Sequence, residues 1–333
     1  MTNDKGLSLI YQILEEDGFM VLDGGMGTML MQAGLESGNP PEEWNTLHPD
    51  RIRAIQKAYI EAGARLILTN SFGGTRFRLK LHNLQDRAAE LNHAAARNAR
   101  VEADAAARPV VVAGSMGPTG EMLEPLGAMT FDEAKAAFAQ QAAALAEGGV
   151  VLLWIETMSA LDEVQAAVEG ARSVCDLPIA ATMTFDTNGR TMMGVTPVQA
   201  LETLRNFNLV ALGGNCGNGP AEIEGVISAM HQADPETILI AKANAGLPRW
   251  VGDDLIYDGT PTVMADYALR VRDLGAKLIG SCCGSTPGHI KSMAQALANT
   301  PIGQAVIKVP FNVSEAKEGK PTRTRRRRRK HSE

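Results

Sequence analysis

Three cysteines lie in two glycine-flanked motifs, and thiols placed in this way are candidate metal ligands. Cys216 lies in the sequence GGNCG, and Cys282 and Cys283 are adjacent in GSCCG. Three thiolates on one Zn²⁺ leave the fourth tetrahedral position free for water or a substrate. Zinc also lowers the pKa of a bound thiol and undergoes no redox change, so such a site suits thiol chemistry. Spacing alone leaves a second interpretation open, in which these are buried cysteines without a ligand.

Short apolar runs alternate with longer amphipathic segments, and this alternation predicts the elements that would position the cysteines. Strands are predicted at 19–23, 65–69, 110–114, 150–155, 179–183, 209–213, 237–242 and 277–280. Helices are predicted at 49–62, 86–106, 130–147, 159–173, 197–206, 220–232, 260–273 and 287–298. The strand candidates lack polar alternation, as expected for strands buried on both faces. The pattern favours an α/β fold of the (β/α)8 TIM-barrel type, with a doubly wound open sheet as the main alternative.

The starts of several predicted helices carry recognisable signals. Thr130 and Glu133 have the spacing of a capping box, and Pro197, Pro220 and Pro287 suit the first turn of a helix. No linker interrupts the alternation of strands and helices, so residues 1–305 are expected to form one barrel domain.

A barrel would bring the three thiols together. Cys216 follows the sixth predicted strand, whereas Cys282 and Cys283 follow the eighth. Alternate strands contribute to the same interior layer of a TIM barrel, and active sites lie at the C-terminal ends of the strands. We therefore expect these cysteines to converge at the mouth of the barrel. The fourth cysteine, Cys175, follows a predicted helix and is expected to be a packed or surface thiol.

Two acidic residues also follow predicted strands. Asp23 precedes Gly24 and Gly25 after the first strand, and Glu156 follows the fourth. Glycines at such positions let backbone amides approach a ligand closely. Taken alone, Asp23 is better explained as part of a turn-forming Asp-Gly pair, and Glu156 as an acid at a helix N-terminus that faces the helix dipole.

The charge of the chain is divided between an acidic body and a basic C-terminal segment. Nine of the 32 basic and two of the 38 acidic residues lie in 316–333, which leaves 23 basic and 36 acidic residues before it. An acidic body argues against nucleic-acid binding by the folded domain. Residues 306–333 are expected to be an irregular, disordered tail, either solvated or in contact with anionic partners. The sequence shows no signal peptide or membrane span and has few cysteines, which indicates a soluble cytoplasmic protein.

The motifs together resemble those of the homocysteine S-methyltransferase family. This family includes betaine–homocysteine methyltransferases, S-methylmethionine-dependent enzymes and the first module of cobalamin-dependent methionine synthase. The resemblance covers residues 18–300 and is specific as an ordered combination. It rests on LDGGMGT at 22–28, TNSF at 69–72, GP at 117–118, IET at 155–157, GNCG at 214–217 and GSCCGSTP at 280–287. Ser281 departs from the family, which usually has glycine there.

The resemblance implies a zinc-dependent transfer of a methyl group to the thiol of homocysteine, which forms methionine. The family's zinc ligands correspond to Cys216, Cys282 and Cys283, and the homocysteine thiolate would take the open position. Asp23 and Glu156 would hold its amino group. Backbone N–H groups near Gly24 and Gly25 would meet its carboxylate, and Thr69 would belong to the same substrate site.

The methyl donor is predicted to be betaine or another onium compound. A quaternary ammonium donor needs aromatic faces, and Trp44 lies in a loop after the first strand that could cover the barrel mouth. Phe72 and Tyr257 follow other strands, and a loop anchor is the alternative role of Trp44. S-methylmethionine remains an alternative donor, whereas a cobalamin-linked donor is disfavoured because no further module follows residue 300. A non-catalytic zinc- or thiol-binding sensor is the competing class, and a homo-oligomer is compatible with the sequence.

Overall fold

Eight parallel strands form the centre of the computed structural model, which describes residues 3–251 and 254–305. The strands are β1 (Met20–Val21), β2 (Leu66–Leu68), β3 (Val111–Met116), β4 (Leu152–Met158), β5 (Ile179–Met183), β6 (Ala211–Cys216), β7 (Leu239–Ala243) and β10 (Ala276–Ser281). Their order is β1-β10-β7-β6-β5-β4-β3-β2, and a parallel bridge between Leu22 and Leu66 joins the two ends. This closed parallel sheet confirms the predicted TIM barrel and excludes the open sheet.

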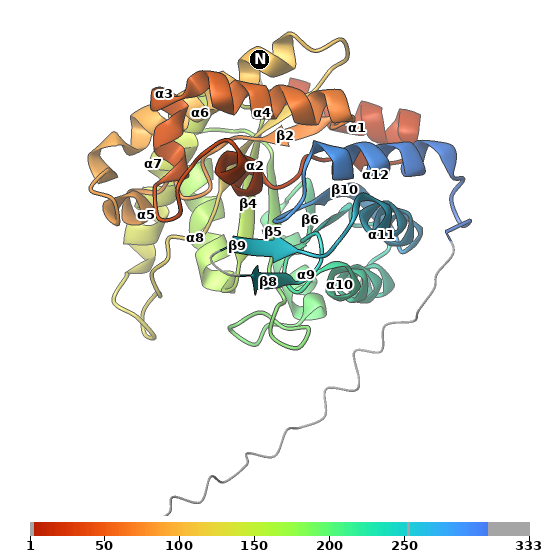
Figure 1. Ribbon diagram of the computed structural model, residues 1–333. Coiled ribbons are helices and arrows are strands. Elements are labelled where there is room, and N and C mark those ends of the chain that lie inside the picture. Colours follow the sequence, from red (N-terminus) through yellow and green to blue (C-terminus); the bar gives the residue numbers. More distant parts are fainter. Residues whose placement is uncertain (1–2, 252–253, 306–333) are drawn as a thin grey trace, which may run out of the picture.

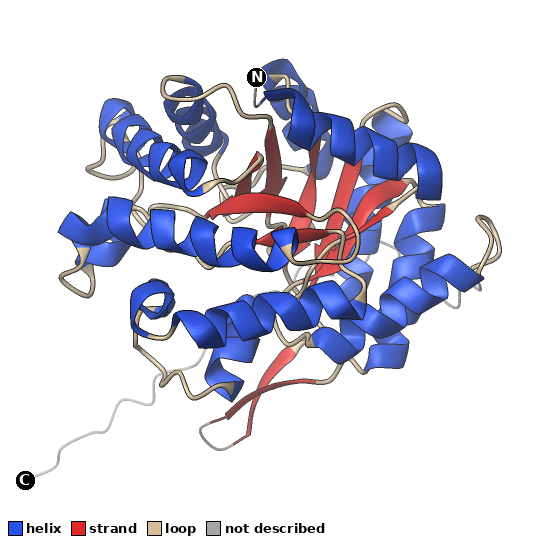
Figure 2. Ribbon diagram, turned by 90° about the horizontal axis from the view of Figure 1, so that it is seen from above, coloured by secondary structure: helices blue, strands red, loops and turns tan. Residues whose placement is uncertain are grey.

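Helices surround the barrel, and all eight predicted ones are present (Figures 1 and 2). They are α4 (Pro49–Ala62), α6 (Ala88–Asp104), α7 (Phe131–Gly148), α8 (Leu161–Arg172), α9 (Pro197–Leu204), α10 (Pro220–Ala233), α11 (Pro261–Asp273) and α12 (Pro287–Asn299). The Thr130–Glu133 capping box is formed, and Pro197, Pro220 and Pro287 open their helices. Local signals therefore set these helix starts as expected.

The inside of the barrel is a packed apolar core. Alternate strand residues such as Met20, Leu66, Val111 and Trp154 belong to one buried cluster, which also contains Ile10 of the N-terminal helix. Because side chains alternate between the two faces of a strand, this cluster fills the interior while the intervening residues pack against the outer helices. The helix α1 (Asn3–Asp17), which we did not predict, thus closes the N-terminal end of the barrel.

Several short elements in the loops were also not predicted. The hairpin β8 (Pro248–Val251) and β9 (Asp254–Tyr257) lies between β7 and α11, and Figure 1 shows it in front of the barrel with α2 (Met26–Gln32). The remaining short elements are η1 (Pro41–Glu43), α3 (Trp44–Leu47), α5 (Arg76–Lys80), η2 (Gln85–Arg87) and η3 (Arg205–Phe207). Most of these elements lie in loops that follow strands at their C-terminal ends.

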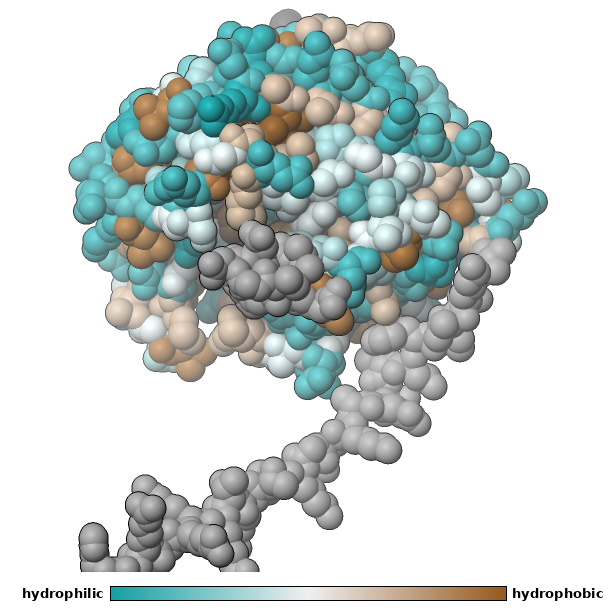
Figure 3. All heavy atoms as spheres, in the orientation of Figure 1, coloured by the Kyte–Doolittle hydropathy of each residue, from teal (hydrophilic) through white to brown (hydrophobic). Residues whose placement is uncertain are grey.

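On the face seen in Figure 3, hydrophobic residues are scattered among hydrophilic ones rather than gathered in one broad patch. None of the helices in the described ranges is long and apolar enough to cross a membrane. The expected basic tail, residues 306–333, lies outside the described residues.

Candidate active site

A pocket of about 240 Å³ opens at the C-terminal ends of the barrel strands. Every predicted site residue except Trp44 lines it, although these residues come from five different strand ends. The lining residues include Asp23, Gly24, Gly25, Thr69, Glu156, Cys216, Cys282 and Cys283, together with Ser115, Phe72 and Lys242. The barrel therefore brings the candidate thiols and the candidate carboxylates into one cavity, at the end where TIM-barrel active sites lie.

The three thiols converge at one side of this pocket. The Sγ atoms of Cys216, Cys282 and Cys283 all lie within 4.8 Å of one another, and those of Cys216 and Cys282 are 3.1 Å apart. A tetrahedral zinc ion with Zn–S bonds of about 2.3 Å separates its sulfur ligands by about 3.8 Å. The cluster thus fits a zinc ion after small side-chain adjustments. Hydrogen bonds from Cys216 and Cys282 hold the pKa of the Cys283 thiol well below its ordinary value.

The side chain of Asn215 joins the end of its own strand, β6, to β4 and β5 beside the pocket. Its side-chain Oδ1 accepts hydrogen bonds from the backbone N–H of Thr157 at 2.9 Å and from the Thr182 hydroxyl at 2.7 Å. Its Nδ2 donates to Thr157 Oγ1 at 2.7 Å. Both Thr157 and Cys216 have a positive φ, at 63° and 60°, which is unusual for residues other than glycine. Asn215 therefore stabilises the strained segment beside Glu156 and immediately precedes the first cysteine of the cluster.

The Gly24–Gly25 turn packs against the loop that carries the paired cysteines. A Cβ atom on Gly24 would lie 2.5 Å from Ser285 Oγ, so glycine is required for this close approach. The Gly25 N–H donates to Ser285 Oγ at 3.0 Å, and that hydroxyl donates to Cys282 O at 2.7 Å. Of the two predicted amides, only the Gly24 N–H has no acceptor among the described residues. Sequence reasoning did not identify Ser285, although it lies in the recognised GSCCGSTP motif.

A lysine that sequence reasoning missed lies against Asp23. Lys242 Nζ is 2.7 Å from Asp23 Oδ1, and both side chains are about 2% exposed. The other oxygen of Asp23 accepts the backbone N–H of Leu68 at 2.7 Å. Burial alone would lower the pKa of the Lys242 ammonium, but the carboxylates of Asp23 and Glu156 raise it above its ordinary value. The available signal was a lysine at the end of the apolar run TILIAK, which lacks other charged residues.

Glu156 is the second buried carboxylate of the pocket. Its Oε1 accepts a hydrogen bond from Ser115 Oγ at 2.5 Å, whereas its Oε2 has no hydrogen-bond donor among the described residues. Burial raises the pKa of Glu156 to about 7 despite the nearby Lys242. Thr69 supports this region, because its Oγ1 accepts the Ser115 backbone N–H at 3.0 Å. One oxygen of Glu156 is therefore available to a ligand in the pocket.

Trp44 lies outside the lining of the pocket. Its side chain is buried, its ring meets His48 edge-on with centroids 4.7 Å apart, and Arg51 lies 5.0 Å from the ring centre. This packing beside Arg51 of α4 (Pro49–Ala62) is the arrangement expected of a loop anchor, the alternative role. Phe72 does line the pocket and is 39% exposed, and the Tyr257 ring would meet a Cβ atom on Gly284, the residue after Cys283.

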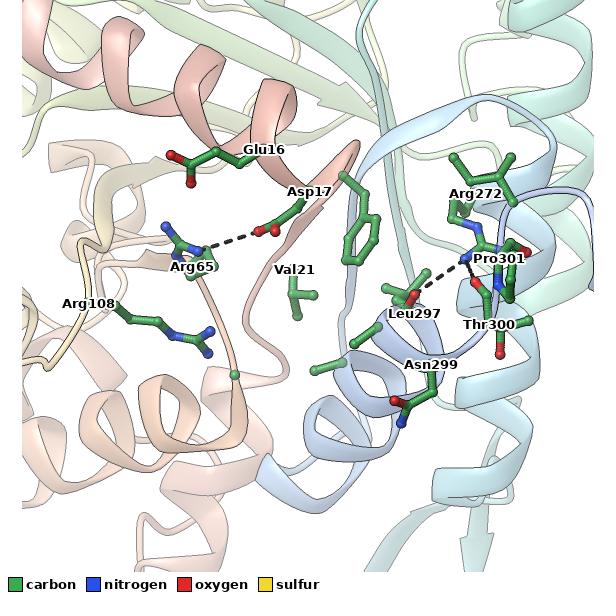
Figure 4. Close-up of a pocket in the computed structure, with 15 residues that line it drawn as sticks. Glu16, Asp17, Val21, Arg65, Arg108, Arg272, Leu297, Asn299, Thr300 and Pro301 are labelled. Carbon is green, nitrogen blue, oxygen red and sulfur yellow. Dashed lines mark hydrogen bonds and ion pairs between the residues drawn. The ribbon is translucent and has the colours of Figure 1, made fainter.

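A second cavity, of about 540 Å³, lies near the N-terminal ends of the strands and is lined by three arginines (Figure 4). Arg65 pairs with Asp17 at 3.5 Å, and Arg272 donates hydrogen bonds to the backbone oxygens of Thr300 and Pro301. These two cationic groups are therefore engaged in holding the ends of α1 and α12. At this end of a TIM barrel such contacts contribute to stability, and the cavity contains no thiol.

The known proteins that this chain resembles agree with the thiol chemistry of the pocket. The family model described as homocysteine S-methyltransferase matches residues 20–297. Methionine synthase from Mycobacterium tuberculosis is 33% identical over 299 residues, which is 84% of this chain and 25% of that protein. Methionine synthase from Mycobacterium leprae is 32% identical over 298 residues, with 84% and 24% covered. The chain thus spans about a quarter of the length of these relatives.

Solved structures share the barrel. The oxidised form of the homocysteine methyltransferase MmuM from Escherichia coli superposes with a TM-score of 0.74 and is 23% identical, covering 86% of this chain and 99% of that one. Its metallated form gives the same TM-score at 22% identity with the same coverage. At this level of identity the comparison shows a shared fold, and that fold is the closed barrel described above.

Proposed function

The chain belongs to the homocysteine S-methyltransferase family, and we propose that it is a zinc-dependent enzyme that transfers a methyl group from a small onium donor to homocysteine. Methylation of homocysteine is the activity of the family, and the proposal concerns the metal, the donor and the residues involved. The observation that carries it is the convergence of three thiols and a buried acidic group in one pocket.

Cys216, Cys282 and Cys283 would hold the zinc ion. Their mutual distances and thiol chemistry fit the metal, and three protein ligands leave one tetrahedral position for a substrate. When bound, zinc keeps a substrate thiol deprotonated near neutral pH and leaves it able to act as a nucleophile. The metallated form of MmuM supports a metal in this fold.

The remaining groups of the pocket would orient homocysteine. The acidic end formed by Asp23 and Glu156 would hold its amino group, and the Gly24 N–H would donate to its carboxylate. Thr69 would act indirectly, since its hydroxyl accepts the Ser115 N–H and Ser115 in turn donates to Glu156. Anchoring both ends of the amino acid places its sulfur towards the cysteine cluster, and this positioning is a major contribution to catalysis.

The transfer would be a direct displacement at carbon. A lone pair of the homocysteine sulfur forms the new S–C bond to the methyl group, while the C–N or C–S bond of the donor breaks. The electron pair of that bond leaves with the donor, which departs as a neutral amine or sulfide group. No side-chain base is required for this step, because the thiol has already lost its proton.

Betaine or a sulfonium compound such as S-methylmethionine is the proposed donor class. Phe72 at the pocket and Tyr257 beside the Cys282–Cys283 loop offer aromatic faces for a diffuse cation. Trp44 would not contribute a face, since it packs against His48 and Arg51. The similarity to methionine synthases favours a second candidate, in which the methyl group arrives from a cobalamin.

A donor panel tests the proposal. Methionine formation from homocysteine would be measured with betaine, S-methylmethionine and methylcobalamin, each before and after zinc is removed by a chelator. We expect turnover with an onium donor that chelation abolishes and zinc restores. If methylcobalamin supports turnover and neither onium compound does, the methyl donor is a cobalamin and not an onium compound. Tight homocysteine binding without turnover on any donor would favour a thiol-binding sensor.

A further inference from the structure

A half-buried arginine beside the active-site pocket has no partner. Arg78 lies on α5 (Arg76–Lys80), in the segment that follows β2. Its guanidinium group makes neither a hydrogen bond nor an ion pair with any residue in the described ranges. A cation that is partly removed from water is costly unless an acceptor compensates for the lost hydration, and a guanidinium has five N–H donors to satisfy. Arg78 is therefore available to an anionic ligand.

One short loop contacts both Arg78 and the aromatic ring of the pocket. A Cβ atom on Gly120 would lie 3.0 Å from Arg78 Nη1, and one on Gly117 would lie 2.5 Å from Phe72 Cε2. Three residues span at most about 11 Å, so the guanidinium and the ring pack against two nearby points of the same loop. The Gly120 N–H also has no acceptor among the described residues. A small ligand at the ring would thus find a cation and a free N–H close by.

Glu42 supplies the opposite charge on the side of the ring. It lines the pocket together with Phe72 and is 5% exposed, and its Oε1 accepts the Gly73 N–H at 2.6 Å. Burial raises the pKa of Glu42 above its ordinary value, while the nearby Arg78 cation opposes this effect. No ion pair joins Glu42 to Arg78 within the described ranges. Two opposite charges therefore lie near one aromatic ring without contacting each other.

We propose that Arg78 determines donor specificity by binding a carboxylate of the methyl donor, while Phe72 and Glu42 face its onium group. A carboxylate accepts two parallel N–H bonds from a guanidinium, and a diffuse cation is attracted both to an aromatic face and to a carboxylate. The inference rests on the proposed function and deepens it, because it defines the donor as a zwitterion. Betaine and S-methylmethionine both carry an onium group and a carboxylate.

The experiment compares two sulfonium donors that differ only in the carboxylate. Dimethylsulfonioacetate carries one, and trimethylsulfonium does not. Methionine formation by the zinc-loaded full chain at saturating homocysteine gives the KM of each compound, or its inhibition constant where it is not turned over. The ratio of the two constants measures recognition of the carboxylate. In Arg78→Gln we expect this ratio to fall by roughly 10- to 100-fold, as for loss of charge-assisted hydrogen bonds, with trimethylsulfonium changed less than about threefold.

Two variants separate a direct contact from a general effect of charge. Arg76→Gln removes the same charge from the same helix at an exposed side chain, and it should leave the ratio within about twofold of the original. Arg78→Lys keeps the charge without the planar fork and should retain part of the ratio. An equal loss for both donors in Arg78→Gln would overturn the proposal, because Arg78 would then support only Glu42 or the fold. An equally large fall of the ratio in Arg76→Gln would also overturn it.

The original protein distinguishes a failure of this inference from a failure of the proposed function. If it transfers a methyl group from both sulfonium compounds with the same KM, the proposed function stands and the carboxylate site is overturned. If it uses neither of them, nor betaine, nor S-methylmethionine, the onium donor itself is overturned and this inference falls with it. A lower KM for dimethylsulfonioacetate than for trimethylsulfonium, lost in Arg78→Gln alone, is the result that we expect.

Discussion

The side chain of Asn215 makes two hydrogen bonds to Thr157. Its Oδ1 accepts the Thr157 backbone N–H at 2.9 Å, and its Nδ2 donates to the Thr157 hydroxyl oxygen at 2.7 Å. This contact joins the end of β6 (Ala211–Cys216) to the end of β4 (Leu152–Met158), two strands that are separated by β5. Cys216 follows Asn215 directly, and Glu156 precedes Thr157 directly. One amide group therefore sets the relative position of a thiol and a carboxylate that both line the pocket.

Replacement of the Asn215 side chain should disturb the positions of Cys216 and Glu156 together. In Asn215→Ala the half-buried Thr157 N–H and the buried Thr182 hydroxyl lose their acceptor, which is expected to lower the free energy of unfolding by roughly 1–3 kcal/mol. Zinc affinity and homocysteine affinity should also fall. Denaturant unfolding and metal titration check this. The matched control is Asn206→Ala, which removes one exposed hydrogen bond to Glu202 and should change little.

Zinc binding should depend on the clustered thiols and not on the fourth cysteine. We expect Cys216→Ala to lose most of its zinc and its methyl transfer, since two thiolates hold the ion less tightly than three. Cys175→Ala should remain zinc-loaded, because that half-buried thiol follows α8 and contacts Ala171 O at 3.6 Å. Elemental analysis of the purified variants measures the zinc content. A fully loaded and active Cys216→Ala protein would contradict the assignment.

The fold was predictable because local signals and hydrophobic pattern agreed along most of the chain. Four of the eight outer helices start at the capping or proline signals identified from the sequence, and their apolar faces cover an apolar sheet. The strand ends were predicted less well. The apolar run before Glu156 suggested an end at 155, yet β4 continues to Met158. The backbone of β4 still pairs with β5 there, although the side chains become polar. A pattern of apolar residues reports burial and not backbone pairing, so it did not predict this extension.

The site was predictable where residue type and motif determine it, and not where a contact between distant strands does. The convergence of Cys216 with Cys282 follows from the parity of their strands in a barrel. The pairing of Lys242 with Asp23 depends on side-chain reach across β10, which lies between β7 and β1. Trp44 has a residue type that suits an onium cage, but its orientation is decided by packing against His48 and Arg51.

Recognition of the ammonium group should weaken as the pH falls. Burial raises the pKa of Glu156 to about 7, so the carboxylate is largely ionised at pH 8 and largely protonated at pH 6, where it cannot pair with a cation. The preference for homocysteine over 4-mercaptobutanoate, its analogue without the amino group, should therefore fall by about tenfold between these values. The comparison cancels the pH dependence of the thiol, which both ligands share. In Glu156→Gln the preference should not change with pH, and a persistent pH dependence would assign the titration to another group.

The close packing of Gly24 against the cysteine loop can be tested with a single methyl group. In Gly24→Ala the new Cβ would lie 2.5 Å from Ser285 Oγ and 2.9 Å from Tyr59 Cε1, so one of these side chains must move. Ser285 holds both the Gly25 N–H and Cys282 O, and its displacement would shift a zinc ligand. We expect a loss of about 1–3 kcal/mol in the free energy of unfolding together with weaker zinc binding.

Gly27→Ala separates this steric effect from a general effect of glycine replacement. A Cβ atom on Gly27 has no heavy atom within 4 Å, and the residue lies in the first turn of α2 (Met26–Gln32). Alanine restricts the unfolded chain and favours the helix, so this variant should gain about 0.5–1 kcal/mol. Thermal unfolding with and without zinc measures both variants. Equal changes in the two would mean that the contact between Gly24 and Ser285 does not support the metal site, whereas opposite signs would show that the cysteine loop depends on it.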